Sequence, residues 1–229
     1  MKSTRSAPRP AQFSDTDIAA FIREHLPLMP APTLPHVLIH QATAKSGLGR
    51  IAEDGSPFWA YCWPGGLALA HHIFAHPGLV KGRKILDLGT GSGLLAIAAA
   101  MSGASAVTAI DIDRRAVIAA SLNADANAVN LNARCLDILD DETLPFDLVI
   151  VGDLFYDPEL AERTLACLSR YQAKGIDVLI GDPGREFLPA PKLALISAYL
   201  VPDIGSAAPI SKKESGVYKL SQPCPCAAS

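Results

Sequence analysis

The sequence has little net charge and no long apolar run. Its 229 residues carry 20 Lys and Arg against 23 Asp and Glu, a formal net charge of −3. That balance gives no electrostatic reason to expect a nucleic-acid partner. No uninterrupted apolar run approaches the roughly 20 residues of a membrane-spanning helix. Disorder requires low hydrophobicity and high net charge, whereas 49% of these residues are hydrophobic. We therefore expect a folded domain without a membrane or nucleic-acid partner.

Cysteines are few, and their spacing does not suggest a metal site. Cys62, Cys135 and Cys167 stand alone in apolar surroundings, as expected of reduced core thiols in a cytoplasmic protein. Cys224 and Cys226 flank a proline in a Pro/Ala/Ser-rich tail, and neither a second cysteine pair nor a histidine follows at ligand spacing. The pattern predicts neither a disulfide framework nor a metal centre.

The chain divides by composition into four parts. Residues 1–14 are basic and contain two prolines that would interrupt a helix, a composition that predicts a flexible arm. An extension or lid over 15–81 begins with a helix that Asp15 or Asp17 would cap, ended by the proline-rich segment 27–35 and followed by a strand at 36–42. The core is expected over 82–222, and 223–229 form a flexible tail.

The core shows short apolar runs that alternate with helical segments. Strands are predicted at 84–89, 106–112, 132–138, 146–153 and 177–183, with helices near 93–102, 113–127 and 158–172. Strands that read as continuous Val, Ile and Leu are covered on both faces, which indicates a parallel sheet between helices. Two further strands, near 195–204 and at 216–220, complete a seven-stranded, mostly parallel, doubly wound α/β fold of the Rossmann-like class.

A glycine-rich loop follows the first core strand. The segment "DLGTGSG" places Asp87 before Gly89, Gly91 and Gly93, and it opens a helix. The dinucleotide fingerprint G-x-G-x-x-G would need its last glycine where Leu94 stands. The G-x-G-x-G spacing instead resembles motif I of class I S-adenosylmethionine-dependent methyltransferases, whose ligand contains no pyrophosphate. The expected cofactor is S-adenosylmethionine, with S-adenosylhomocysteine as its product.

Acidic residues end the next two predicted strands. Asp111 ends the second strand, where a carboxylate can accept both hydroxyls of a ribose. Asp137 ends the third, where a side chain can meet the edge of an adenine. Either acid alone would more often cap a helix, and this is how we interpret Asp113. The glycine loop and both acids on successive strands together predict a nucleoside site at the carboxyl edge of the sheet.

Several blocks resemble family 16 of the seven-β-strand lysine methyltransferases. They are "PFWAYCWPGG" (57–66), "DLGTGSG" (87–93), "MSGAS" (101–105), "DIDRRA" (111–116), "GDLFYD" (152–157) and "IGDPGR" (180–185). "DLFY" fits the D-x-F-Y signature of that family. The first and last blocks resemble its branch that methylates the beta subunit of electron transfer flavoprotein. The resemblance implies a protein-lysine N-methyltransferase that acts on a lysine-bearing protein, and we expect a monomer.

The resemblance also implies roles for residues after the fourth strand. Asp153 and Tyr156 would border the channel that brings a lysine to the methyl group, with Asp153 beside the cofactor as well. An ordinary aspartate, with a pKa of about 3.9, is a poor base for an ammonium group, so Asp153 is expected to orient the amine. Phe155 is expected in the core, and Trp63 against the cofactor. Arg185 would bind an acidic part of the substrate or solvent.

Three alternatives differ in substrate or chemistry. A nucleic-acid amino methyltransferase would carry two prolines at the positions of Leu154 and Phe155, where this chain has none. A ribosomal-protein methyltransferase shares the glycine loop and the "DID" block, and would also modify protein lysines. A non-catalytic binding module would use the fold as a docking surface, and it would have no reason to keep the glycine loop or Asp111.

Overall fold

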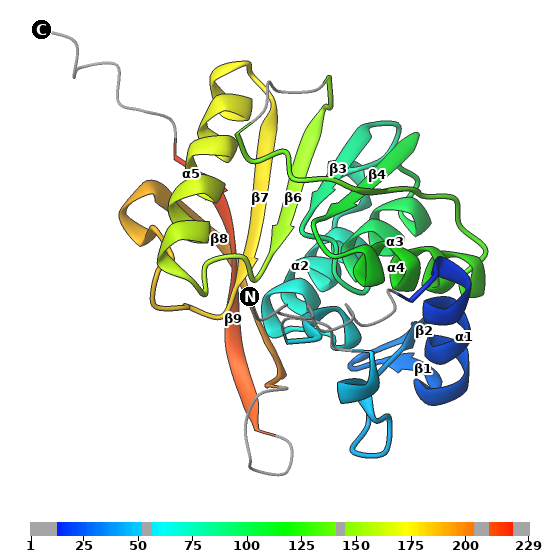
Figure 1. Cartoon of the computed structure of the whole chain (residues 1–229). Helices are drawn as coiled ribbons and strands as arrows, with labels where there is room; N and C mark the ends of the chain where they lie inside the picture. Colours follow the sequence, from blue (N-terminus) through cyan, green and yellow to red (C-terminus); the bar gives the residue numbers. More distant parts are fainter. Residues whose placement is uncertain (1–12, 52–55, 141–144, 204–210, 222–229) are drawn as a thin grey trace, which may run out of the picture.

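A seven-stranded sheet forms the centre of the computed structural model, which describes residues 13–51, 56–140, 145–203 and 211–221. The strand order is β5-β4-β3-β6-β7-β9-β8 (Figure 1). The strands are β3 (Lys84–Leu88), β4 (Ala106–Asp111), β5 (Asn132–Cys135), β6 (Leu148–Gly152), β7 (Asp177–Asp182), β8 (Leu193–Pro202) and β9 (Lys212–Leu220). The first five are parallel, and β9 runs antiparallel between β7 and β8. The predicted doubly wound fold is confirmed.

The chain changes direction along the sheet at β3. From β3 it proceeds outward through β4 to β5, then returns to place β6 on the other side of β3. In open α/β sheets the crevice for ligands lies outside the carboxyl ends of the strands at such a switch point. The loops after β3, β4 and β6 therefore converge on one place.

Alternate residues of the central strands enter two separate cores. Ile85 and Ile150 pack with α2 (Pro64–Ala75) and α3 (Leu94–Met101), whereas Leu86 and Val149 pack with α5 (Pro158–Ala173). Figure 1 shows α5 on one side of the sheet. This period of two buries both faces and explains the continuous apolar runs. Helix α2 also packs against β7, β8 and β9, which argues for a core that begins at α2 rather than at residue 82.

Local capping fixes where three helices begin. Asp113 caps α4 (Arg114–Ala126) by accepting from the Arg115 amide, as predicted, and Asp157 caps α5 in the same way. For α1 (Asp15–His25) the predicted cap is wrong. Ser14 Oγ caps this helix by accepting from the Asp17 amide, and the Asp17 carboxylate accepts from the Ser14 amide in a capping box.

The N-terminal extension contains a hairpin that the sequence only half predicts. The proline-rich segment, expected only to end α1, forms β1 (Leu28–Ala31), and the expected strand begins earlier, as β2 (Leu34–His40). Two asparagines of α4 hold β2: Asn123 Oδ1 accepts from the His40 amide and Asn127 Oδ1 from the Leu38 amide, both at 2.8 Å. Short 3₁₀ turns complete the described chain: η1 (Leu48–Arg50), η2 (Phe58–Ala60), η3 (Pro77–Leu79) and η4 (Ala190–Lys192).

The cysteine prediction is right for two of the three residues that the structure describes. Cys62 and Cys167 are buried free thiols, but Cys135 is exposed, because β5 is the edge strand and ends there. Cys224, Cys226 and the predicted tail lie outside the described residues, as does the predicted arm up to residue 12.

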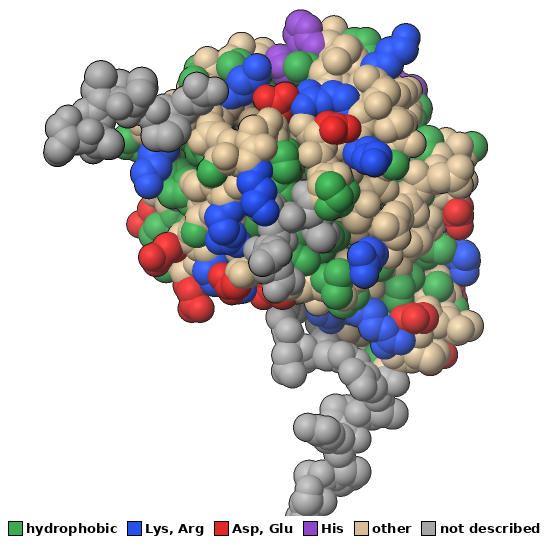
Figure 2. Space-filling model, turned by 90° about the horizontal axis from the view of Figure 1, so that it is seen from above, with side chains coloured by type: hydrophobic (Ala, Val, Ile, Leu, Met, Phe, Trp, Pro, Cys, Tyr) green, Lys and Arg blue, Asp and Glu red, His purple; other side chains and the backbone are tan. Residues whose placement is uncertain are grey.

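The described residues carry no single-sign surface in the view of Figure 2, where basic and acidic side chains are interspersed. No described helix combines the length and apolar character needed to cross a bilayer. Within the described ranges, no three His, Cys, Asp or Glu side chains gather as metal ligands would.

Candidate active site

A cavity of about 650 Å³ opens at the carboxyl ends of β3, β4 and β6. Its volume is that of a site for a small molecule or cofactor. Most of the residues predicted for the site line it: Trp63, Gly89, Gly91, Asp111, Asp137, Asp153 and Tyr156. The two others, Asp87 and Gly93, lie outside its walls. The topology therefore brings together residues from five separate segments of the chain.

The glycine loop folds into a shape that larger residues would disturb. Gly89 has φ +70°, and a Cβ there would lie 2.7 Å from the Leu154 side chain. Gly93 has φ +82°, and its Cβ would lie 2.9 Å from Ala120 of α4. Gly93 thus lets α3 begin against α4, which is a packing role. Its predicted contact with the cofactor stays a prediction.

Asp87 lies beneath the loop rather than in the cavity. Its buried carboxylate accepts hydrogen bonds from Thr90 Oγ1 at 2.5 Å and from the Ala96 amide at 3.1 Å. Burial raises the pKa of Asp87 to about 7 despite these two bonds. The other carboxylate oxygen has no partner among the described residues. Asp87 ties the loop to the first turn of α3, and its predicted contact with the cofactor stays a prediction.

Asp111 stands at the end of β4 with its carboxylate fixed by the backbone. Its oxygens accept from the Gly91 amide and the Asp113 amide, each at 2.9 Å. Burial raises the pKa of Asp111. A carboxylate oxygen can accept more than one hydrogen bond, so both oxygens keep acceptor capacity for the hydroxyl pair of a ribose.

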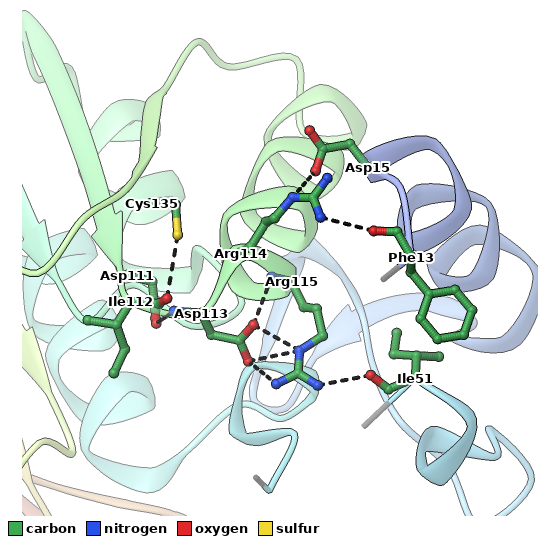
Figure 3. Close-up of polar contacts among 9 residues, drawn as sticks. All are labelled: Phe13, Asp15, Ile51, Asp111, Ile112, Asp113, Arg114, Arg115 and Cys135. Carbon is green, nitrogen blue, oxygen red and sulfur yellow. Dashed lines mark hydrogen bonds and ion pairs between the residues drawn. The ribbon is translucent and has the colours of Figure 1, made fainter. Parts of the chain in front are cut away.

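Two arginines join this edge to the N-terminal extension (Figure 3). Arg114 forms an ion pair with Asp15 at 2.5 Å and donates to the Phe13 carbonyl at 2.9 Å. Arg115 pairs with Asp113 and donates to the Ile51 carbonyl at 2.9 Å. The extension is thereby attached beside the rim of the cavity, since Arg114 and Arg115 also line it.

Asp137 lies in the cavity, but beyond the strand that was expected to end with it. Strand β5 stops at Cys135, and Asp137 accepts from the Leu139 amide at 3.1 Å and from Arg163 at 2.8 Å. The hydrogen bond from Arg163 holds the pKa of Asp137 below its usual range. Nearby, Ile112 is 71% exposed and Leu136 38% exposed in the same cavity wall. These two apolar side chains, which the sequence reasoning missed, suit the faces of a flat ring.

Asp153 is held at both carboxylate oxygens. Oδ2 accepts from the Gly66 amide at 2.9 Å, in the first turn of α2, and Oδ1 accepts from Arg185 Nη2 at 2.6 Å and Nε at 3.1 Å. The residue adopts φ +58°, a conformation that costs energy outside glycine and often marks functional sites. The expectation that Arg185 faces an acidic substrate or solvent is wrong.

Burial changes the acidity expected of Asp153. Its side chain is 5% exposed, and burial raises its pKa to about 6 even though Arg185 and the Gly66 amide favour the ionised form. The premise that it titrates like an ordinary aspartate is therefore wrong. A carboxylate with a pKa of about 6 is still ionised in most molecules at neutral pH.

Aromatic rings form the wall next to Asp153. Phe58 lies 5.3 Å from Tyr156 and 5.7 Å from Trp63 between ring centroids, and the Trp63 indole donates to the Phe58 carbonyl at 2.7 Å. The guanidinium of Arg185 lies over the Trp63 ring at 5.6 Å. Tyr156 is 45% exposed at the mouth, whereas Phe155 is fully buried in the core, as predicted.

These walls fit S-adenosylmethionine. The cavity offers the Asp111 acceptors for a ribose, exposed apolar side chains for a base, and close backbone at Gly89 and Gly91. The indole N–H of Trp59, another wall residue, is buried and has no partner within the described ranges, which leaves a donor for a ligand.

Comparisons with known proteins agree with this geometry. Residues 75–155 match the family described as ribosomal protein L11 methyltransferase (PrmA). The electron transfer flavoprotein beta subunit lysine methyltransferase of Xenopus laevis is 39% identical over 183 residues, 77% of this chain and 74% of that protein. The Mus musculus protein of the same name is 46% identical over 178 residues, 75% of this chain and 70% of that protein.

One solved structure supports the fold alone. It is described as "Conversion of a Disulfide Bond into a Thioacetal Group during Echinomycin Biosynthesis" and has a TM-score of 0.53 at 21% identity. The likeness covers 75% of this chain and 90% of that chain. The family assignment rests on the two relatives, whose matches extend across most of both sequences. The chain belongs to the electron transfer flavoprotein beta subunit lysine methyltransferase family, whose members are S-adenosylmethionine-dependent protein-lysine methyltransferases.

Proposed function

We propose that this enzyme methylates lysine side chains of the electron transfer flavoprotein beta subunit, and that the lysine enters between Asp153 and the aromatic wall. The observation that carries the proposal is the buried Asp153 carboxylate, held at the inner end of a wall made by Phe58, Trp63 and Tyr156. The substrate identity is supported by relatives at 39% and 46% identity. That the enzyme is a cytoplasmic monomer stays a prediction.

The cofactor would lie along the glycine loop. Gly89 and Gly91 give a close backbone, Asp111 accepts from the ribose, and Ile112 and Leu136 flank the base with Asp137 near its edge. When bound, S-adenosylmethionine supplies a methyl group on a sulfonium, which becomes a neutral thioether as a neutral amine takes up the methyl. Trp63 would cover the reacting end and exclude water.

The aromatic wall and Asp153 have different tasks. A narrow aromatic channel suits the long apolar stem of lysine and favours a cationic head by cation–π attraction. At its inner end, the Asp153 carboxylate accepts a hydrogen bond from the amine and aims its lone pair. Productive attack requires a separation of about 3–3.5 Å and an aligned orbital. Tyr156 adds a phenol at the mouth, where it borders the stem.

Proton loss sets the energetic demand on this site. A free lysine has a pKa of about 10.4, so the neutral amine costs about 4.6 kcal/mol at pH 7. Asp153, with a pKa of about 6, is too weak a base to remove that proton efficiently at neutral pH. We assign it to orientation, with the proton passing to water before attack.

Mapping the methylated atom tests the substrate. The purified chain and labelled cofactor are incubated separately with the flavoprotein beta subunit, with ribosomal protein L11 and with total RNA, all from the same source. We expect label on lysine Nε of the beta subunit, located by peptide mass spectrometry. Label on L11 instead would favour the ribosomal alternative, for which the match over residues 75–155 is the specific observation. Label on RNA would overturn the substrate class.

A further inference from the structure

The ion pair between Asp153 and Arg185 occupies the position that the substrate amine must approach. Arg185 reaches Oδ1 of Asp153 with two nitrogens, at 2.6 and 3.1 Å, and the remaining oxygen accepts from Gly66. The arginine side chain is 24% exposed and lines the same cavity. A lysine that enters this site therefore meets a carboxylate already paired with a permanent cation.

We propose that Arg185 is a positioning residue for methyl transfer: it keeps the Asp153 carboxylate ionised while pairing with its charge, so that the lysine amine meets a hydrogen-bond acceptor whose own charge is already balanced by a neighbouring cation. This inference rests on the proposed place of Asp153 beside the amine. A lone buried carboxylate would do the opposite in two ways. It would take up a proton itself, or it would stabilise the ammonium form of the lysine, which has no lone pair to react.

Among the groups around Asp153, Arg185 is the cation that decides whether this carboxylate stays ionised. Asp182, fully buried at the end of β7, adds a second negative charge beside Asp153 and accepts from the Arg185 amide at 2.7 Å. The Gly66 amide at the start of α2 contributes a helix N-terminus, which favours an anion. The other charged groups nearby interact electrostatically with the neighbours of Asp153. Asp111 and Asp157 raise the pKa of Tyr156, and Lys213 favours the ionised form of Asp182. Asp182 and Glu214 in turn raise the pKa of Tyr218.

The fixed shape of the pair adds orientation to charge. The Arg185 guanidinium lies over the Trp63 ring at 5.6 Å, and the Arg185 amide is anchored on Asp182, so the arginine is held on two sides. Its two nitrogens hold Oδ1 while the Gly66 amide holds Oδ2, and the two contacts together fix the rotation of the carboxylate. A lysine in place of Arg185 would supply the charge without that fork.

The first test is a titration without cofactor or substrate. Carboxyl-¹³C-labelled aspartate is followed by NMR in the full chain, and Asp153→Asn identifies the Asp153 resonance. In Arg185→Gln we expect its midpoint to rise by about one pH unit or more, the scale for an opposite charge within hydrogen-bond distance. Arg185→Lys should stay near wild type. An unchanged midpoint in Arg185→Gln would overturn the inference.

The second test is the pH profile of turnover with the flavoprotein beta subunit. Arg185→Gln should move the acid limb of kcat upward by about one pH unit or more and regain activity at high pH. Arg185→Lys should keep the wild-type limb with a lower plateau, because charge is retained and the fork is lost. A loss by the same factor at every pH in both variants would show a merely structural role and overturn the inference.

A matched control separates these effects from general destabilisation. Arg83 pairs with Asp177 at 2.7 Å, at the opposite ends of the strands. Arg83→Gln should lower the melting temperature without moving either the Asp153 midpoint or the acid limb. The proposed function fails separately: full activity of Asp153→Asn would remove Asp153 from the amine site, whereas an unmoved titration in Arg185→Gln with an inactive Asp153→Asn would reject the arginine role alone.

Discussion

Two adjacent glycines at the start of α2 should respond in opposite ways to the same substitution. A Cβ at Gly65 would lie 2.3 Å from the Gly181 carbonyl oxygen and 2.6 Å from Asp153 Oδ2. A Cβ at Gly66 would meet only the end of Leu94, at 4.0 Å. Contacts under 3 Å with backbone cannot be relieved by a rotamer change, so Gly65→Ala must shift α2 away from β7.

The size of the effect follows from overpacking. Inserting a methyl group into a packed interior typically costs about 1–3 kcal/mol, and in a chain of this length each kcal/mol lowers the melting temperature by about 2–4 °C. We therefore expect Gly65→Ala to lower the melting temperature by about 2–12 °C. Gly66→Ala should be unchanged or up to about 1 kcal/mol more stable, because alanine favours the helix over glycine.

The assay is a paired thermal unfolding experiment with cofactor-binding calorimetry. Because the displaced helix carries the Gly66 amide that binds Asp153, Gly65→Ala should also lose most methyl transfer, while Gly66→Ala keeps it. Equal melting temperatures and equal activities in the two variants would refute the contact between α2 and β7 on which the position of Asp153 depends.

Two other predictions concern the cofactor loop. Asp111→Ala removes the ribose acceptor and should weaken S-adenosylmethionine binding by about 1.5–3 kcal/mol in calorimetry, the scale of hydrogen bonds to a charged group; an unchanged dissociation constant would exclude Asp111 from the site. Asp87 has a pKa raised to about 7, so the folded cofactor-free protein holds a proton there that the unfolded chain releases near pH 4. Folding stability that this proton provides at low pH is lost as pH rises from about 4 to about 7, by at most about 4 kcal/mol. Relative to wild type, Asp87→Asn should therefore gain stability in urea unfolding as pH rises over this range, and a difference independent of pH would contradict the assignment.

The sheet was predictable because its signals are local. Continuous apolar runs located β3, β4, β6 and β7 to within a few residues, and glycine spacing located the loop. Strand β1 was missed because Pro30 suggests a helix stop, and only pairing with β2 makes the segment a strand. The cap of α1 was misassigned because Ser14, Asp15 and Asp17 all fit the composition of a cap.

Side-chain partners in the site were beyond sequence reasoning. Arg185 lies 32 positions from Asp153, and only the pairing of β6 with β7 brings them together. The raised pKa of Asp153 likewise comes from burial by α2 and the sheet. Asp87 and Gly93 were predicted against the cofactor because their motif is contiguous, but the turn directs them inward to α3 and α4.

The most direct test of the account is the activity of Asp153→Asn. Asparagine tolerates φ +58° as well as aspartate does, so the backbone should be kept, and Asp177→Asn serves as a control at the far end of the sheet. With the flavoprotein beta subunit as substrate, we predict that Asp153→Asn binds S-adenosylmethionine with near wild-type affinity and loses most lysine methylation. Retained turnover with a lowered melting temperature would contradict the claim that this carboxylate orients the reacting amine.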